Sequence, residues 1–254
     1  MILLRSILFN IAFFTNITVL LVVALPTLVM PRSAVFKVGK IWARSSLWLL
    51  KVICGTDVEF RGRENIPQGA FIVAPKHQSA WETFALIMLF DDFCYILKRE
   101  LTFIPLFGWY IWKSGQIAIN RATGSSALAQ AEEKAREIFA EGRQLFIFPE
   151  GTRRPAGAPP HYKFGVAHLY DACQVPCLPI VLNSGLFWAR RSLIKRPGTI
   201  VVEILPPIAP GIEKQEFFAL LQERMEKASE DLIAEATSRD PSLMSIVLRN
   251  RQLP

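Results

Sequence analysis

The chain has 254 residues, 51% of them hydrophobic, and a formal net charge of +7. This length fits one large domain with a full core better than two domains. The hydrophobic fraction is high for a soluble enzyme and low for a polytopic membrane protein. The basic residues are not interleaved with a nucleic-acid-binding motif, so we expect no nucleic-acid partner.

An uncharged apolar segment, ILFNIAFFTNITVLLVVALPTLVM, covers residues 7–30. About 20 apolar residues span a bilayer, so this segment is long enough to cross one. Its polar residues also suit partial embedding in one leaflet. A cleaved signal peptide, with its site at Val22-Val23-Ala24, is the alternative. Against cleavage, the apolar run continues beyond Ala24 and is longer than a usual signal core.

Positive charge is concentrated in the same part of the chain. Six basic residues and no acidic residue lie before residue 57, namely Arg5, Arg32, Lys37, Lys40, Arg44 and Lys51. Five of them follow the apolar segment, so the positive-inside tendency predicts that the bulk of the protein is cytoplasmic. Residues 33–53 predict an amphipathic helix that lies on anionic lipid, with an ordinary core helix as the alternative. We therefore predict membrane-anchoring helices at 1–55 and one domain at 56–254.

Short apolar runs alternate with amphipathic segments over the rest of the chain. This alternation predicts a layered α/β domain. The segment 100–115, broken by Pro105 and Gly108, predicts short helical pieces around a cleft. Strands are predicted at 57–62, 70–75, 93–98, 116–120, 144–149, 177–183 and 198–205, and helices at 79–90, 124–141, 164–173 and 214–237.

The stretch APKHQSAWET, residues 74–83, places His77 just after a buried strand, where open α/β sheets bind ligands. Ser79 and Glu82 fit an S-x-x-E capping box, in which Glu82 bonds back to the Ser79 amide. Residues five apart do not share a helix face. If His77 lies in the loop before the helix, however, Glu82 can accept a hydrogen bond from its Nδ1. Nε2 is then left to take a proton, and the two interpretations are compatible.

A second informative stretch is FIFPEGTRRP, residues 146–155. Its glycine permits close backbone approach, and the adjoining hydroxyl and guanidinium groups can hold a phosphate. A solvated surface turn is the alternative. In GQIAINRATG (115–124) an arginine ends a strand, and VPCLPIVLNSG (175–185) predicts a core strand without chemistry of its own. No G-x-S-x-G elbow occurs, so no protein nucleophile is indicated.

Together these stretches resemble the four sequence blocks of the glycerolipid acyltransferase family over about residues 57–205. The first block, usually His-x4-Asp, is similar to His77 through Glu82. The second is similar to Gly115 through Arg121, and the fourth, V-P-x-x-P, to Val175 through Pro179. The third, F-P-E-G-T-R, is complete at Phe148 through Arg153. Glu82 stands where the family commonly has aspartate, which keeps the charge and lengthens the reach.

The resemblance implies a mixed sheet flanked by helices, preceded by a membrane-associated helical arm. It also implies transfer of a fatty acyl group from a thioester to the sn-2 hydroxyl of 1-acyl-sn-glycerol-3-phosphate (lysophosphatidic acid), forming phosphatidic acid. His77 would be the catalytic base and Glu82 its orienting carboxylate. The acceptor phosphate would be bound by Arg121, Gly151, Thr152 and Arg153, with Lys98 and Arg99 as helpers and Glu150 organising the loop.

The implied acyl donor is acyl-coenzyme A or acyl-carrier protein, with no metal and no other cofactor. The implied location is the cytoplasmic face of the inner membrane. The four cysteines form no paired CxxC motif and suit free thiols in a reducing compartment. Three alternatives stay open: an acyltransferase for another lyso-lipid, a lipid hydrolase, and a non-catalytic lipid-binding protein.

Overall fold

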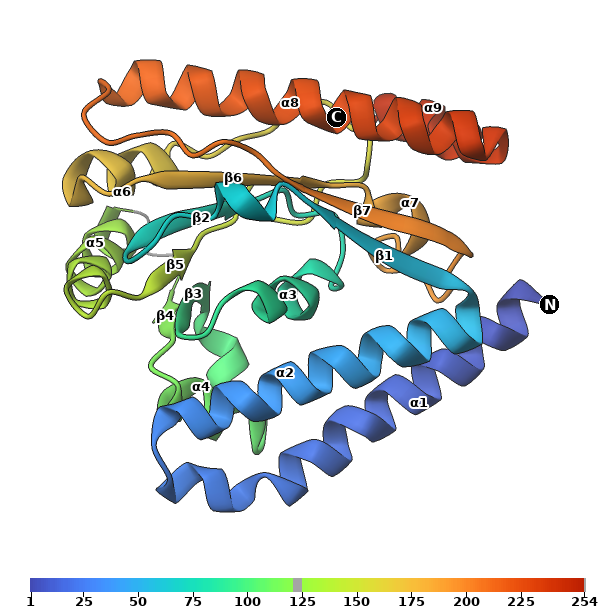
Figure 1. The fold of residues 1–254 in the computed structure, drawn as a ribbon, viewed down its shortest axis with the longest axis horizontal. Coiled ribbons are helices and arrows are strands. Elements are labelled where there is room, and N and C mark those ends of the chain that lie inside the picture. Colours follow the sequence, from blue (N-terminus) through green and yellow to red (C-terminus); the bar gives the residue numbers. More distant parts are fainter. Residues whose placement is uncertain (121–124, 254) are drawn as a thin grey trace.

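The computed structural model describes residues 1–120 and 125–253. The chain begins with a helical arm of two long helices, α1 (Ile2–Val23) and α2 (Arg32–Leu49), which lie side by side (Figure 1). A 3₁₀ turn at Leu25–Val29 joins them, and α2 ends in a π-type turn at Leu50–Cys54. Gly55, with a φ of +72°, then turns the chain into the sheet, because glycine adopts this left-handed conformation without a steric cost.

Helix α1 is long and apolar enough to cross a membrane, and it is the one helix of the described residues that meets this test. Much of its surface is exposed and bears large apolar side chains. Its other side is packed: Phe13 contacts the rings of Trp42, Phe84 and Trp188. The arm is therefore joined to the rest of the protein by an aromatic core.

The described residues form a seven-stranded sheet in the order β1-β7-β6-β2-β5-β3-β4. Neighbouring strands are parallel except for β6 and β7, so the sheet is mixed, as expected. The carboxyl ends of β2 to β6 consequently meet at one edge. The strands are β1 (Thr56–Arg61), β2 (Phe71–Pro75), β3 (Phe93–Lys98), β4 (Ile117–Ile119), β5 (Gln144–Phe146), β6 (Cys177–Leu182) and β7 (Gly198–Ile204).

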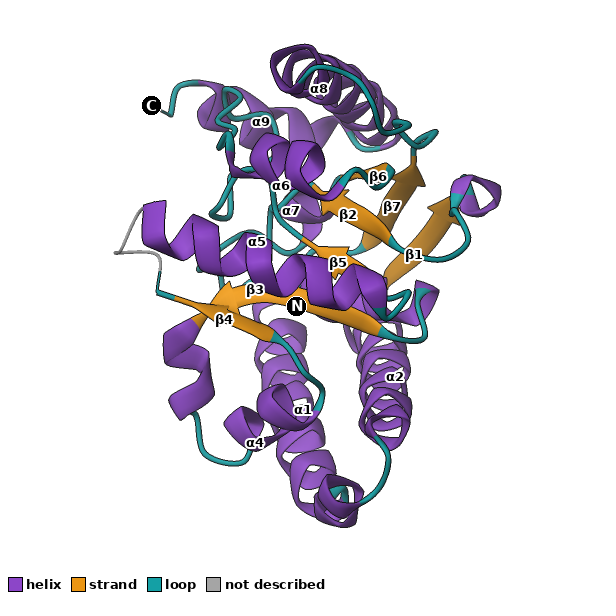
Figure 2. Ribbon diagram, turned by 90° about the vertical axis from the view of Figure 1, so that its left-hand side faces the viewer, coloured by secondary structure: helices purple, strands orange, loops and turns teal. Residues whose placement is uncertain are grey.

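Helices cover both faces of the sheet (Figure 2). The short helix α3 (Glu82–Ala85) and the arm lie on one side, and α8 (Lys214–Arg239) and α9 (Met244–Arg251) lie on the other. Alternate residues of each strand supply the two cores: Val73 and Phe146 face the arm side, whereas Ile72 and Leu145 face α5, α6 and α8. The remaining helices are α4 (Phe107–Lys113), α5 (Ser125–Ala140), α6 (Gly165–Cys173) and α7 (Ser184–Phe187).

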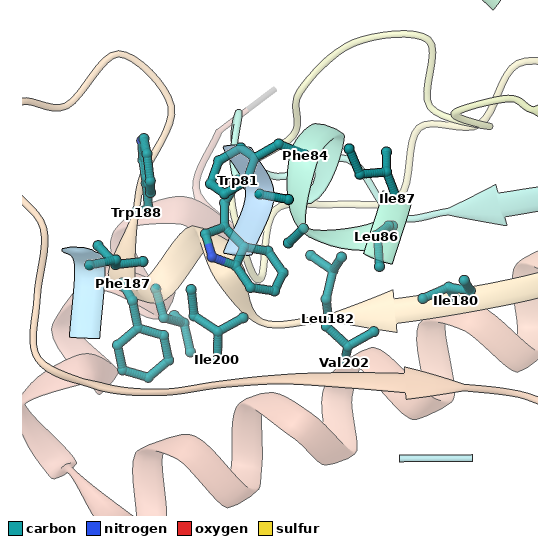
Figure 3. Packing of buried hydrophobic residues seen from close by; sticks show 14 of the residues in the cluster. Trp81, Phe84, Leu86, Ile87, Ile180, Leu182, Phe187, Trp188, Ile200 and Val202 are labelled. Carbon is teal, nitrogen blue, oxygen red and sulfur yellow. The ribbon is translucent and has the colours of Figure 1, made fainter. Parts of the chain in front are cut away.

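The core on the arm side is rich in aromatic residues (Figure 3). Trp81 and Phe84, which flank the start of α3, pack against Leu182 of β6 and Ile200 of β7. Trp81 is fully buried. The turn that carries Glu82 is thus fixed by the packing of its neighbours in sequence.

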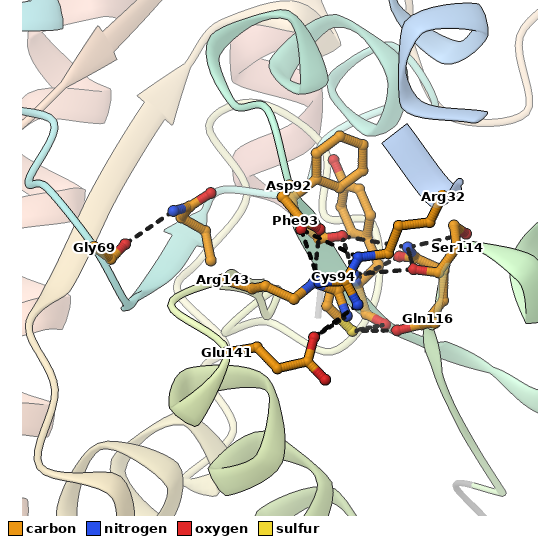
Figure 4. A network of polar contacts seen from close by, with 12 residues as sticks. Arg32, Gly69, Asp92, Phe93, Cys94, Ser114, Gln116, Glu141 and Arg143 are labelled. Carbon is orange, nitrogen blue, oxygen red and sulfur yellow. Dashed lines mark hydrogen bonds and ion pairs between the residues drawn. The ribbon is translucent and has the colours of Figure 1, made fainter. Parts of the chain in front are cut away.

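A buried arginine network ties the arm to the sheet (Figure 4). The Nε of Arg143 donates to Asp92 at 2.8 Å, and its Nη2 donates to the carbonyls of Phe93 and Ser114 at 3.0 and 2.9 Å. Arg32, at the start of α2, binds the other oxygen of Asp92 at 2.9 Å and Glu141 at 2.7 Å. Asp92 therefore links the arm to the sheet through two guanidinium groups.

Three sequence predictions need correction. The helix predicted at 79–90 begins at Glu82 and becomes a 3₁₀ turn at Leu86–Leu89. The strand predicted at 144–149 ends at Phe146, three residues before Pro149. The helix predicted to close the fold, 214–237, is followed by α9, whose Asn250 donates to the carbonyl of Ala156 at 2.9 Å.

Candidate active site

The candidate site lies at the edge where β2, β5 and β6 end. His77 follows β2, Glu82 begins α3, and the F-P-E-G-T-R loop follows β5. Ser184, which follows β6, reaches the same place. Because these three strands are parallel, their ends bring segments far apart in the sequence into contact.

His77 lies in the loop before α3, and Glu82 points back to it, as the sequence predicts. The His77 Nδ1 and the Glu82 Oε1 are 2.9 Å apart. The imidazole also stacks on the ring of Phe148, with centroids 4.0 Å apart. Its side chain is 16% exposed. With Nδ1 donating to the carboxylate, Nε2 is the nitrogen able to accept a proton.

The carboxylate of Glu82 is fully buried and accepts hydrogen bonds from four further groups. Its Oε1 accepts from the backbone amides of Gln78 and Ser79, both at 2.7 Å. Its Oε2 accepts from the hydroxyls of Ser79 at 3.1 Å and Ser184 at 2.9 Å. This many donors holds the carboxylate in one orientation, and through it the imidazole.

The capping box is present in part. The expected bond from the Ser79 amide to Glu82 forms. The Ser79 hydroxyl, however, accepts from the amide of Trp81 at 2.8 Å, inside the turn that precedes the helix. The helix-start and the histidine-orienting interpretations of Glu82 are therefore both realised by the same carboxylate.

The loop after β5 packs directly beside His77. Glu150 accepts from the His77 amide at 2.7 Å, and the Arg154 amide donates to the His77 carbonyl at 2.7 Å. Burial raises the pKa of Glu150. Gly151 has a φ of +65°, and the next residues, Thr152 and Arg153, are exposed and half-buried. The polar groups predicted to bind phosphate thus lie at the same edge as the imidazole.

Lys76 connects this loop to α8. It is buried, with its Nζ 3.1 Å from the Glu150 Oε1 and 2.6 Å from the Glu226 Oε1. The Tyr162 hydroxyl donates to the same Glu226 oxygen at 2.7 Å. Glu150 therefore joins His77 on one side to a buried ion-pair network on the other.

Positive charge gathers at the outer side of the loop. The Arg190 Nη1 donates to the Arg153 carbonyl at 2.9 Å. Burial and the charges of Arg191, Arg153 and Arg154 lower the pKa of Arg190. A guanidinium group repelled by three neighbouring guanidinium groups indicates a local excess of positive charge, which is suited to an anionic ligand.

The other predicted phosphate-binding residues are less closely associated with His77. Lys98 ends β3 and pairs with Glu100 at 2.9 Å, while its side chain is 57% exposed. Arg99 follows it and is exposed. Both belong to the sheet edge that carries the site, because β3 is parallel to β5. Arg121 lies outside the described residues.

An apolar cavity of about 190 Å³ lies between the arm, β3 and α4. Tyr95 lines it and connects it to the site, because its ring stacks with Phe148 at 6.2 Å and Phe148 stacks with His77. The cleft predicted near 100–115 is thus found, with the arm as its other wall. The lining includes Leu20, Leu21, Phe36, Trp42, Ile87, Tyr110 and Ile111.

Two residues of the candidate site, Ser184 and Lys76, were not predicted from the sequence. The pattern of residues 175–185 predicts only a core strand and gives Ser184 no role, although the small polar residues that follow β6 are a signal for a strand-end site. Lys76 adjoins His77 in the sequence, but nothing there indicates its partners on α8. Among the described residues, no group of three or more His, Cys, Asp or Glu side chains could hold a metal ion.

The fold and the site together define an α/β protein with a carboxylate-oriented histidine at the sheet edge and an apolar cavity beside it. A family model described as Acyltransferase matches residues 57–183. The chain belongs to this acyltransferase family, which confirms the resemblance seen in its sequence blocks.

The chain is similar to named members of the family. A 1-acyl-sn-glycerol-3-phosphate acyltransferase of Pseudomonas aeruginosa is 38% identical over 194 residues, which cover 76% of each chain. The alpha form of this enzyme from Mus musculus is 31% identical over 63% of this chain and 57% of its own length. The crystal structure of the 1-acyl-sn-glycerophosphate (LPA) acyltransferase from Thermotoga maritima matches with a TM-score of 0.76 and 25% identity, covering 91% of this chain and 99% of that one.

Proposed function

We propose that this protein transfers a fatty acyl group from a thioester to the sn-2 hydroxyl of 1-acyl-sn-glycerol-3-phosphate, forming phosphatidic acid. The relatives cited above are named as acyltransferases of 1-acyl-sn-glycerol-3-phosphate or 1-acyl-sn-glycerophosphate. The observation that carries the mechanism is the 2.9 Å contact between the His77 Nδ1 and Glu82, which leaves Nε2 as the base.

In this mechanism the Nε2 of His77 takes the proton of the sn-2 hydroxyl as its oxygen attacks the thioester carbonyl. The tetrahedral intermediate then collapses, the carbon–sulfur bond breaks, and the thiolate leaves. The imidazolium returns its proton to the thiolate, so His77 ends as it began. Glu82 keeps the ring in one orientation and stabilises its positive charge in between. No residue of the protein is acylated.

The acceptor phosphate is bound at the loop after β5. Gly151, Thr152 and Arg153 supply a turn without a side chain, a hydroxyl and a guanidinium next to His77. Lys98 and Arg99, at the end of β3, belong to the same sheet edge, because β3 is parallel to β5. Arg121 is assigned to the phosphate from its sequence block alone. Glu150, which accepts from the His77 amide, organises the loop and does not touch the acyl carbon.

The acyl chain of the donor occupies the apolar cavity. The aromatic row from Tyr95 through Phe148 to His77 leads from the cavity to the base. The donor is acyl-coenzyme A or acyl-carrier protein. The reaction as written forms and breaks bonds only among hydroxyl, carbonyl and thiol groups, with His77 moving the proton, and the mechanism assigns no step to a metal or further cofactor.

The enzyme works at the membrane that holds its acceptor. Helix α1 is apolar and largely exposed, and five basic residues of the arm follow the apolar segment. This charge distribution favours the cytoplasmic face of the inner membrane. The catalytic domain then corresponds to residues 56–254 and the anchor to residues 1–55.

The test is acyl transfer from a labelled thioester to lysophosphatidic acid by the full chain in detergent. We expect His77→Ala to lower the rate by about two orders of magnitude or more, since a general base contributes roughly 10²–10⁴. His161→Ala, at an exposed histidine outside the site, is the matched control and should keep the parent rate. If the unmutated protein acylates only other lyso-lipids, lysophosphatidic acid is not its acceptor. If the protein hydrolyses the thioester when no lyso-lipid is present, the protein is a hydrolase and the proposal of acyl transfer is wrong.

A further inference from the structure

A cluster of large apolar side chains is exposed on the segment between β3 and β4. Among the described residues after the arm, nine large hydrophobic side chains are exposed, and five of them lie within residues 101–112. Single exposed hydrophobic residues are ordinary, whereas a cluster of them marks an interaction surface. We call this cluster the aromatic patch; it consists of Leu101, Phe103, Ile104, Trp109 and Trp112, with Phe103 71% and Trp112 83% exposed.

The aromatic patch adjoins the end of α1. The Tyr110 hydroxyl, on the inner side of α4, donates to the carbonyl of Leu21 at 2.7 Å. Figures 1 and 2 both show α4 beside the turn that joins α1 to α2. That turn exposes Val29 and Met30, at 90% and 47%. The patch therefore continues the apolar surface of α1 and does not form an isolated spot.

The segment that carries the patch is held firmly. A Cβ on Gly108 would lie 2.0 Å from the carbonyl oxygen of Thr102, so only glycine allows the 3₁₀ turn at Arg99–Phe103 to approach α4 this closely. On the inner side of α4, Tyr110 and Ile111 are buried and line the apolar cavity. The exposed side chains of α4, Trp109 and Trp112, therefore point outward from a helix whose other side is fixed by packing.

The composition of the patch identifies its partner. Tryptophan is enriched where proteins meet the membrane–water interface, because its ring is apolar and its N–H is polar. Lys98, Arg99 and Lys113 flank the patch and can meet lipid phosphates. We propose that the aromatic patch is a second membrane-binding element, which inserts into the lipid surface beside α1. The proposal does not depend on the reaction that the enzyme catalyses.

A fluorescent label tests this directly. Trp112→Cys is labelled with an environment-sensitive nitrobenzoxadiazole dye in the full chain carrying Cys173→Ser, because Cys54, Cys94 and Cys177 are buried. The protein is bound to vesicles of phosphatidylglycerol and phosphatidylethanolamine. We expect the emission to rise and to be quenched by lipids that carry a nitroxide near the headgroup.

Two further labels control the measurement. Leu248→Cys lies on α9, on the side of the molecule away from the arm, is 52% exposed, and should not be quenched. Val22→Cys on α1 should be quenched. The proposal is overturned if position 112 behaves like position 248 while position 22 responds. It is also overturned if the dye at 112 becomes shielded without vesicles, whether by raised protein concentration (a second copy) or by added acyl-carrier protein.

A binding measurement gives a second test that needs no label and no activity. The Phe103→Ser/Trp112→Ser variant should bind the same vesicles with a Kd at least roughly tenfold higher, since burying one such side chain contributes about this factor or more. The control, Met244→Ser/Leu248→Ser, removes two exposed apolar residues from α9 and should bind like the parent. Equal binding by the two variants would contradict the proposal. Because the measurement uses vesicle binding and not activity, it tests the aromatic patch even if the proposed acyl transfer is wrong.

Discussion

At the scale of single residues, Glu82 has two tasks that are usually given to separate side chains. It completes the turn before α3 by accepting the amides of Gln78 and Ser79, and it accepts a hydrogen bond from His77 with the same oxygen. The additional methylene, compared with the aspartate common in the family, does not displace the contact, which is 2.9 Å long. The loop accommodates the longer side chain by placing Ser184 against its other oxygen.

A substitution that keeps the shape of Glu82 separates these two tasks. In Glu82→Gln the amide oxygen can still accept from the His77 Nδ1 and the two backbone amides. The NH2 group, in place of Oε2, can donate to the hydroxyl oxygens of Ser79 and Ser184. The negative charge that would stabilise the imidazolium is lost. We expect kcat to fall roughly 100-fold or more with little change in KM. Steady-state kinetics at saturating thioester measures this. A kcat within a few-fold of the parent would mean that Glu82 acts as a helix cap alone.

Lys195, which lies outside the candidate site, predicts a pH dependence of the free energy of unfolding. Its side chain is buried and lies over the ring of Trp188, and its amide donates to Ser6 of α1. Burial lowers the pKa of Lys195 from 10.5 to about 8. Compared with the unfolded chain, the folded protein therefore favours the neutral amine. Between the folded pKa of about 8 and the unfolded pKa of 10.5, unfolding takes up a proton. The free energy of unfolding should rise with pH across this range and be independent of this group below it.

We compare the parent with Lys195→Met by chemical unfolding in detergent micelles from pH 7 to 10.5. Both proteins carry Cys54→Ala, because burial raises the pKa of this nearby thiol and so gives it a pH dependence of its own. The difference in stability between them should change by at most about 3 kcal/mol, in favour of the parent, as the pH rises. A difference that stays constant over this range would show that the Lys195 amine is charged in the folded protein.

At the scale of elements, the arginine network predicts that replacing Arg143 lowers the free energy of unfolding more than replacing Arg32. Arg143 is buried and donates to the carbonyls of Phe93 and Ser114 at 3.0 and 2.9 Å. Arg143→Met leaves each carbonyl with only a 3.3 Å bond from the Gln116 amide, and should cost roughly 1.5–3 kcal/mol. The ion pairs of Arg32 are partly exposed, so Arg32→Met should cost less than about 1 kcal/mol. Urea unfolding of the two variants measures both. Equal losses would mean that the arm contact, and not the buried carbonyls, dominates the network.

The elements themselves were largely predictable from the sequence, because the strands are short apolar runs such as FIVAP of β2 and CLPIVL of β6. The start of α3 was not, because the preceding amides turn toward the Glu82 carboxylate and leave the helical conformation to begin at Glu82. Helix α9 was missed because its burial depends on contacts such as that of Asn250 with Ala156, which no local pattern reveals. The strand order and the Lys76–Glu226 pair are likewise properties of distant segments.

The candidate site was predictable to the extent that it consists of contiguous motifs. The position of His77 before a helix and of Glu82 in its first turn followed from their spacing and the capping pattern. Ser184 and Phe148 could not be assigned, since their roles come from the alignment of β5 and β6 with β2 in the sheet. The role of Arg121 stays a prediction.

At the scale of the whole molecule, the apolar cavity has walls from both the arm and the sheet domain. Gly39 of α2 lines it, and a Cβ there would lie 3.5 Å from the Cδ1 of Ile87, in ordinary contact. We expect Gly39→Leu to fill the cavity and shift the preferred thioester to shorter acyl chains. Ile41→Leu, at an exposed position two residues away, should leave the preference unchanged.

Competition among donors of different chain length measures this shift. A uniform loss of rate with every donor would indicate damage to the packing of α2. An unchanged preference with full activity would place the acyl chain elsewhere. Only a selective loss with the longest donors agrees with an acyl chain in the cavity.

The pairing of β1 with β7 has a consequence for how the protein is made. β1 is an edge strand whose neighbour is the last strand in the sequence, with Thr56 opposite Gly198. During synthesis the arm therefore leaves the ribosome long before the strand that β1 needs exists, and pairing over such a separation is slow. Helix α1 has this interval to reach the membrane. We expect the sheet to be completed on a chain whose α1 is already at the membrane, so that the unpaired edge of β1 lies at the lipid surface until β7 is made.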